Sequence, residues 1–339
     1  MNQPKKTARP VGFPLAAAVF VLLILLVVSF TALLGSAPHI PLLAAAVLAA
    51  AVGAAHGFSW QEMMDGITDA IRPALPALLI IMSIGILIAA WMAGGIIPTM
   101  VYYGLQIISP RFFLVTALLL CSLVSLAIGS SLSTIGTVGV ALFGIGEALG
   151  IPSAITVGAV VSGAYFGDKM SPLSDTTNLA PSVSDTNVFD HIRHMMMTTT
   201  PAYLICILIY GVLGFVFANG AGGGGDVQAT LGALSEEFAI HPVLLLPPLL
   251  VIVMVIFRIP ALPGLLGAAL LGMLAALTLQ GTGFETLLSG MMNGFSAETG
   301  VAQVDTLLNR GGIMSMMRTV ALMIIALSFA GIFERTGMA

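Results

Sequence analysis

Long apolar stretches without charged residues recur along this chain, and they constrain its fold more than any other feature. A stretch of about 18 apolar residues is long enough to cross a bilayer as a helix. With 58% hydrophobic and only 8% charged residues, the chain lies far outside the composition of soluble domains. Nothing in it alternates in ten-residue segments, as a membrane β-barrel would. We expect an all-α polytopic membrane protein with roughly eight or nine spans, some of them too short for a simple crossing. The clearest stretches are Phe13–Leu34, Ala74–Gly94, Phe112–Ile128, Ala202–Ala218 and Pro242–Ile256.

The N-terminal segment carries Lys5, Lys6 and Arg9 ahead of the first apolar stretch. Small residues at 35–37 would suit a cleavage site, so a signal peptide is an alternative. However, the apolar stretch exceeds the roughly 7–15 residues of a signal peptide, and further spans follow it. We therefore expect a retained first helix with its basic tail in the cytoplasm. The remaining basic residues form no patch, so nothing indicates nucleic acid as a partner.

Two stretches of the sequence match each other without gaps. Apolar residues lie between the matched positions in both stretches, although two apolar helices can also resemble each other by chance. Paired halves with helices interrupted by glycine or proline are typical of secondary transporters. The matched positions are Gly66, Ile67, Arg72, Gly85 and Ile86 against Gly312, Ile313, Arg318, Gly331 and Ile332.

This repeat and the breaks between apolar stretches predict four segments. They are N-terminal transmembrane helices at 1–56, a first repeat at 57–217, a glycine-rich linker at 218–240, and the start of a second repeat at 241–339. The first repeat continues into two polar stretches, whereas the second reaches the C-terminus without a counterpart of either. We expect a transporter of two halves whose second half is incomplete.

The stretch GDKMSPLSDTTN, residues 167–178, places charged and hydroxyl residues directly after an apolar run. Pro172 disfavours helical geometry at Ser171, so the preceding helix should end near Met170 with its last carbonyls unpaired. Residues 174–177 offer N-caps for a new short helix, which Pro181 would end. Such a broken helix presents a negative dipole end, a polar turn and then a positive dipole end. The alternative is a solvated loop between two helices.

Oxygen atoms are abundant around this predicted break. Na⁺ is a hard ion, so it should prefer carbonyl, hydroxyl and carboxylate ligands, as Ca²⁺ and Mg²⁺ do. A carboxylate away from bulk water can hold a proton or a metal ion in alternation. Asp168 is our first candidate for a carboxylate that Na⁺ and a proton share, and Asp175 is the second. Further oxygen ligands are offered by Ser171, Thr176, Thr177 and Asn178.

A second polar stretch, GSSLSTIGTVG at residues 129–139, interrupts the apolar run before it. Ser131, Thr134 and Thr137 would add hydroxyl ligands to the site, while close packing of helices through small residues is the alternative. Lys169 is expected to act either as an internal counter-cation or as the group that binds an anionic substrate. Glu147 stands at a helix end and is expected to face the membrane interface.

Other classes of membrane protein fit less well. The residues FGDK are similar to an aspartyl intramembrane protease motif, but Tyr165 stands where that motif needs glycine. The sequence contains neither HExxH for a zinc protease nor Gly-x-Ser-x-Gly for a serine nucleophile. A channel would need no matching halves, and a pore filter is not evident. We therefore expect no enzymatic activity, and no cofactor beyond transported Na⁺ and H⁺.

Residues 163–203, from GAYFGDKMSPLSDTTN to TTTPAY, closely resemble the signature region of the NhaC-type Na⁺/H⁺ antiporter family. Segments 94–113, 130–146 and 304–317 are similar to further stretches of that family. The resemblance implies a multi-pass secondary transporter of the plasma (inner) membrane with inverted repeats and broken helices. It attaches importance to Asp168, Lys169, Ser171, Asp175, Thr176, Thr177 and Asn178, with Ser131, Thr134 and Thr137 opposite. Family members continue beyond the end of this chain, so it is expected to be truncated.

Our predicted function is exchange of Na⁺ for H⁺ by alternating access, with Na⁺ held by Asp168 and Asp175. The alternative is Na⁺- or H⁺-coupled exchange of a small organic acid, of the malate and lactate type, or of an amino acid, since members similar to this chain transport such substrates. The expected partners are membrane lipid and small ions, with a small organic anion under the alternative. Homo-oligomerisation is left open.

Overall fold

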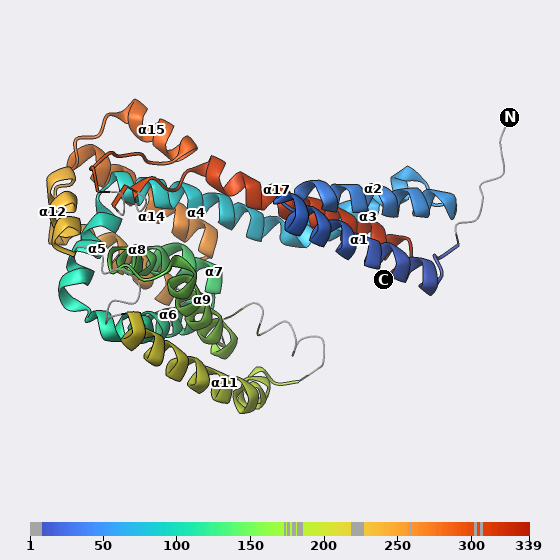
Figure 1. The fold of residues 1–339 in the computed structure, drawn as a ribbon, viewed down its shortest axis with the longest axis horizontal. Coiled ribbons are helices and arrows are strands. Elements are labelled where there is room, and N and C mark those ends of the chain that lie inside the picture. Colours follow the sequence, from blue (N-terminus) through green and yellow to red (C-terminus); the bar gives the residue numbers. More distant parts are fainter. Residues whose placement is uncertain are drawn as a thin grey trace. The chain divides into compact units, whose positions relative to one another are not determined.

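The computed structural model describes residues 9–172, 174, 177, 181, 186–217, 227–257, 259–301, 304–305 and 308–339. These residues form helices joined by turns, with no strand among them. The chain divides into two compact units, one made of Met1–Leu79 with Met316–Ala339 and the other of Ile80–Ser315. Two helices, α4 (Leu75–Ala93) and α17 (Ile313–Arg335), begin in one unit and end in the other (Figure 1).

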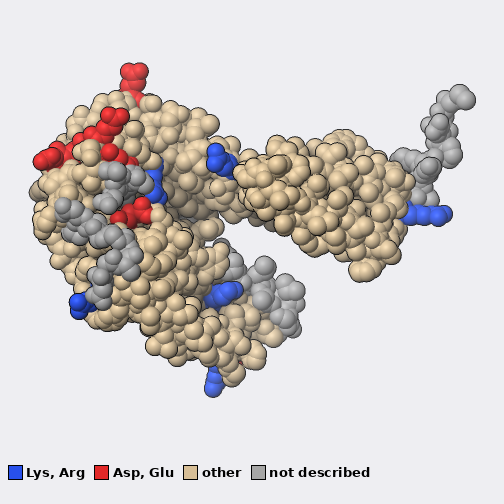
Figure 2. Space-filling view, viewed as in Figure 1, with Lys and Arg blue, Asp and Glu red and all other residues tan. Residues whose placement is uncertain are grey.

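The predicted polytopic membrane protein is confirmed. Among the described residues, five helices are long and apolar enough to cross a membrane, or up to seven if each of two bent pairs is one span. We expected eight or nine, and the difference arises where apolar segments are short or bend by 108° and 100° within a pair. Figure 2 shows a surface that carries few charges over either unit on the face drawn. Large apolar side chains such as Phe13 and Leu33 are exposed, as lipid contact requires.

The first unit is built on a pair of adjacent helices, α1 and α2, together with α3 and the larger part of α17. A capping box starts α3, because Ser59 accepts from the backbone of Glu62 and the Glu62 carboxylate accepts from the backbone of Ser59. Pro73 interrupts the helical backbone by only one 3-10 turn, since proline in a first helical turn removes no hydrogen bond. The bounds are α1 (Phe13–Leu34), α2 (His39–Ala55), α3 (Trp60–Ile71) and η1 (Arg72–Ala74).

Glycine brings α3 and α17 into backbone contact inside this unit. A Cβ added at Gly66 would lie 2.5 Å from the carbonyl oxygen of Gly331, so only glycine permits this approach. Beside this crossing, Met63, Phe329 and Ile332 are buried and form part of the apolar core of the first unit.

The second unit surrounds a core that includes the fully buried Trp91 and Phe113. Its two most closely associated helices are α6 and α9. The described part of the predicted linker contains α12. The bounds are α5 (Ile96–Ile107), η2 (Pro110–Phe112), α6 (Phe113–Ile128), α7 (Ser131–Thr134), η3 (Ile135–Gly139), α8 (Val140–Ala148), α9 (Ser153–Met170), α11 (Val188–Val216), α12 (Val227–Glu237), η5 (Pro242–Leu245), α13 (Leu246–Ile256), α14 (Ala261–Thr278) and α15 (Phe284–Asn293).

Candidate functional site

Glycines set the distance between α6 and α9, the two helices that carry the polar stretches at their ends. A Cβ added at Gly167 would lie 2.7 Å from the backbone nitrogen of Leu126 and 2.8 Å from Cβ of Ser125, and closer still to the carbonyl oxygen of Ser122. Gly163, one turn earlier, lies against the backbone of α6 in the same way. This Gly-x-x-x-Gly spacing is the usual means of bringing two membrane helices together. It holds the next residue, Asp168, beside the end of α6.

The chain leaves α6 at Gly129, whose positive φ of 69° ends the helix in the left-handed region. Ser130 then caps the next helical segment through its hydroxyl, which accepts from the backbone of Ser133. Residues 131–148 form one helical run, in which the π-turn η3 separates α7 from α8. π-Turns inside helices occur frequently at functional sites. The predicted interruption of the apolar run is therefore present, and it places Ser131 at the start of a new helix.

The predicted end of α9 is confirmed at Met170, and Ser171 follows in extended geometry. The backbone nitrogen of Ser171 donates to the carbonyl oxygen of Asp168 at 3.1 Å. The hydroxyl of Thr177 lies 3.2 Å from the carbonyl oxygens of both Asp168 and Lys169, so it caps the last turn of the helix. The helix dipole makes this end electronegative.

Asp168 is buried at this electronegative end, with only 7% of the residue exposed. Its Oδ2 accepts a hydrogen bond of 2.9 Å from the hydroxyl of Ser131. Its Oδ1 is also buried and has no hydrogen-bond partner within the part of the chain that the structure describes. Buried polar atoms normally have a partner, and leaving one without costs about 1–3 kcal/mol, or more for a charged group. An unpartnered carboxylate oxygen is thus the atom to which a proton or a cation would bind.

The other predicted site residues differ in their placement. Thr134 and Thr137 are buried, and their hydroxyls donate to carbonyls of their own helical run, at 3.0 Å to Ser130 and 2.7 Å to Ser133. Ser171 is fully buried, whereas Lys169 is exposed. Asp175, Thr176 and Asn178 lie outside the described residues. The structure therefore brings Asp168, Ser131, Ser171 and Thr177 together.

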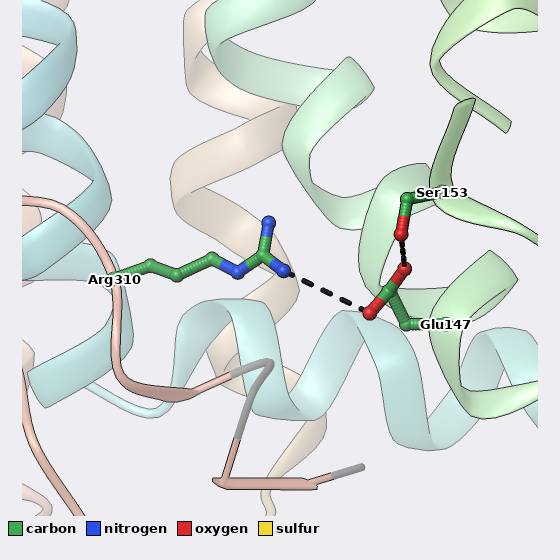
Figure 3. Close-up of polar contacts among 3 residues, drawn as sticks. All are labelled: Glu147, Ser153 and Arg310. Atoms are coloured by element: carbon green, nitrogen blue, oxygen red, sulfur yellow. Dashed lines mark hydrogen bonds and ion pairs between the residues drawn. The ribbon is translucent and has the colours of Figure 1, made fainter. Parts of the chain in front are cut away.

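Glu147, Ser153 and Arg310 form a second polar cluster. The sequence did not predict it, since Glu147 was expected to face the membrane interface. Figure 3 shows Glu147 between Ser153 and Arg310. Ser153 donates its hydroxyl to Oε1 of Glu147, and Nη2 of Arg310 lies 3.7 Å from Oε2. The guanidinium also lies over the ring of Phe143, 4.3 Å from its centroid. No local pattern predicts this pair, because its members are far apart in the sequence.

Comparison with known proteins places this architecture among transporters. Residues 163–339 match the Na⁺/H⁺ antiporter family. The Na⁺/H⁺ antiporter NhaC of Alkalihalophilus pseudofirmus is 43% identical over 302 residues, which are 89% of this chain and 65% of that protein. The NhaC antiporter of Bacillus subtilis is 39% identical over 327 residues, covering 96% of this chain and 72% of that protein.

A relative with a different substrate matches nearly as well. The malate-2H⁺/Na⁺-lactate antiporter of Bacillus subtilis is 40% identical over 313 residues, which are 92% of this chain and 67% of that protein. The chain thus spans about two thirds of the length of these curated relatives. No solved structure matches it. The extent of the match and the shared identity confirm the predicted family: the chain belongs to the Na⁺/H⁺ antiporter family.

Proposed function

We propose that this protein exchanges Na⁺ for H⁺ across the plasma membrane by alternating access, with Asp168 as the shared binding group. The observation that carries the proposal is the buried Oδ1 of Asp168, which lacks a hydrogen-bond partner among the described residues. It lies at the electronegative end of α9, which favours a cation. Relatives named as Na⁺/H⁺ antiporters support the same exchange.

The arrangement suits competition between the two ions at one carboxylate. When Asp168 is deprotonated, Na⁺ can be bound by Oδ1 together with hydroxyl and carbonyl oxygens nearby, the ligands that hard cations prefer. When Asp168 is protonated, its carboxyl group is neutral and no longer attracts Na⁺. Ser131 keeps Oδ2 hydrogen-bonded in both states and so fixes the orientation of the carboxyl group. Asp175, Thr176 and Asn178 remain predicted ligands.

A second function is favoured by particular relatives. The malate-2H⁺/Na⁺-lactate antiporter and an arginine/ornithine antiporter of Halobacterium salinarum, 38% identical over 284 residues, are named for organic substrates. The exposed Lys169 next to Asp168 would then hold a substrate carboxylate. Under either function we expect a transporter without enzymatic activity. We place its basic N-terminal tail, with Lys5 and Lys6, in the cytoplasm.

The experiment that tests the proposal uses the full chain in everted membrane vesicles from a host without its own Na⁺/H⁺ antiporters. Na⁺ added to vesicles with a preformed pH gradient should release protons, and the apparent KM for Na⁺ should rise as the pH falls. Asp168→Asn should abolish this flux, while Asp190→Asn, at an exposed position on α11, should retain it. Flux preserved in Asp168→Asn refutes the role of Asp168. Flux that appears only with malate, lactate or an amino acid favours the second function.

A further inference from the structure

The helical run 131–148 and α9 form a hairpin whose two ends have different tasks. The helices are antiparallel: Gly139 lies against Val160 and Gly146 lies against Thr156. At the open end, Ser131 contacts Asp168. At the closed end, the short connection 149–152 joins α8 to α9. The hydroxyl of Ser153 donates to Glu147 across this connection.

Arg310 contacts the closed end of this hairpin from a distant part of the sequence. It precedes α17 and belongs to the predicted second repeat, whereas the hairpin belongs to the first. Its guanidinium lies over Phe143 and near Glu147, two residues one turn apart on α8. The side chain of Glu147 is 14% exposed and that of Arg310 is 36% exposed. Burial lowers the pKa of Arg310, and the charge of Glu147 opposes that shift.

The position of Arg310 is itself held by the backbone. Its carbonyl oxygen accepts from the backbone of Phe295 at 3.1 Å. The next residues, Gly311 and Gly312, have positive φ values of 88° and 80°, which glycine adopts without strain. Gly312 donates its N–H to the carbonyl oxygen of Gly85 in α4 at 2.7 Å. The backbone that follows Arg310 is thus bonded to α4, while the guanidinium of Arg310 reaches α8.

We propose that Glu147 and Arg310 are a positioning pair, through which the predicted second repeat holds the hairpin that carries the ion site. This inference rests on the proposed function. The run 131–148 continues through η3 without interruption and packs along α9, so a displacement of the closed end is transmitted to Ser131 and Asp168 at the open end. The run from Ser131 to Glu147 spans roughly 24 Å at 1.5 Å per residue. Neither Glu147 nor Arg310 contacts the ion, and their effect is on the rate at which the site changes its access.

The test is a double-mutant cycle in the full chain, with Glu147→Gln, Arg310→Gln and the pair together. Glutamine at 147 retains an acceptor for Ser153 but removes the charge. We expect each single variant to lower the maximal exchange rate about 3- to 10-fold, as for residues coupled in one network, and the double variant to be no slower than the slower single variant. Na⁺ binding to the purified protein, measured with ²²Na⁺, should change less than twofold. Arg310→Lys should restore part of the rate, because lysine keeps the charge but loses the planar fork.

Controls separate this inference from the proposed function and from misfolding. Glu236→Gln, exposed on α12, should match the wild type. A wild type without Na⁺/H⁺ exchange would overturn the proposed function itself. If the wild type exchanges ions, two results overturn the positioning pair. In the first, the single variants retain the full rate; in the second, the rate losses of the single variants multiply in the double variant. A loss of ²²Na⁺ binding in Glu147→Gln also overturns it, since that result would place Glu147 in the ion site.

Discussion

Replacing Gly167 by alanine should separate α6 and α9, the two helices on which the proposed ion site depends. The added Cβ would lie 2.7 Å from the backbone nitrogen of Leu126, whereas ordinary contact begins at 3.4 Å. The backbone of α9 must therefore retreat by at least 3.4 − 2.7 = 0.7 Å, and further to clear the carbonyl oxygen of Ser122. If this shift reaches Asp168, its hydrogen bond to Ser131 lengthens from 2.9 to 3.6 Å, which no longer counts as a hydrogen bond.

The free energy of unfolding should fall by about 2 kcal/mol in this variant. Overpacking of a core costs about 1–3 kcal/mol, and the upper value applies because two of the closest atoms belong to the backbone of α6. Alanine in a helix regains about 1 kcal/mol over glycine. Gly232→Ala in α12 is the matched control, because nothing lies within 4 Å of its added Cβ. That variant should gain about 0.5–1 kcal/mol.

Thermal unfolding in detergent checks both changes, measured as the fraction of monodisperse protein that remains after heating at a fixed rate. At about 2 °C per kcal/mol, Gly167→Ala should lower the midpoint by about 4 °C, and Gly232→Ala should raise it by about 1–2 °C. Exchange in vesicles should fall with Gly167→Ala only. A Gly167→Ala protein as stable and as active as the wild type would refute the packing of α6 against α9 on which the site is built.

Three further changes test single contacts. Ser131→Ala should raise the apparent KM for Na⁺, because it leaves Oδ2 of Asp168 without its donor at a cost of about 1–3 kcal/mol; an unchanged KM would contradict this contact. Thr177→Val should lower the free energy of unfolding by about 1 kcal/mol, because valine keeps the shape of threonine but lacks the hydroxyl that donates to the last carbonyls of α9; an unchanged thermal midpoint would contradict this cap. Tyr203→Phe should reduce stability by a similar amount through the loss of its hydroxyl bond to Ser122, while exchange continues, because the ring that stacks on Phe166 is retained.

Local patterns were enough to predict the helices and their breaks. The first helix has the predicted bounds, Phe13–Leu34. The apolar run sets its extent, and Gly35, with its positive φ, ends it. The end of α9 at Met170 follows from Pro172, whose ring excludes helical geometry at the residue before it. The Gly-x-x-x-Gly spacing of Gly163 and Gly167 could also have predicted close packing in that helix, although it does not name the partner.

The partners of the site residues could not be predicted, because they depend on pairing between distant segments. Ten residues were predicted for the site, and sequence alone gave Ser131, Thr134 and Thr137 equal standing. The structure separates them: Ser131 donates to Asp168, 37 positions away, whereas Thr134 and Thr137 donate to their own helical run. Hydroxyls in helices readily donate to the carbonyl four residues earlier. Whether a hydroxyl donates to another segment instead depends on the packing of its neighbours.

The glycine contacts add a physical reason to the predicted repeat. The matched stretches differ by 246 positions, since 312 − 66 and 331 − 85 give the same offset. Within the first unit Gly66 contacts Gly331, and within the second unit Gly312 donates to the carbonyl of Gly85. Exchanging each residue for its predicted counterpart converts the first pair of residues into the second. The repeat itself stays a prediction.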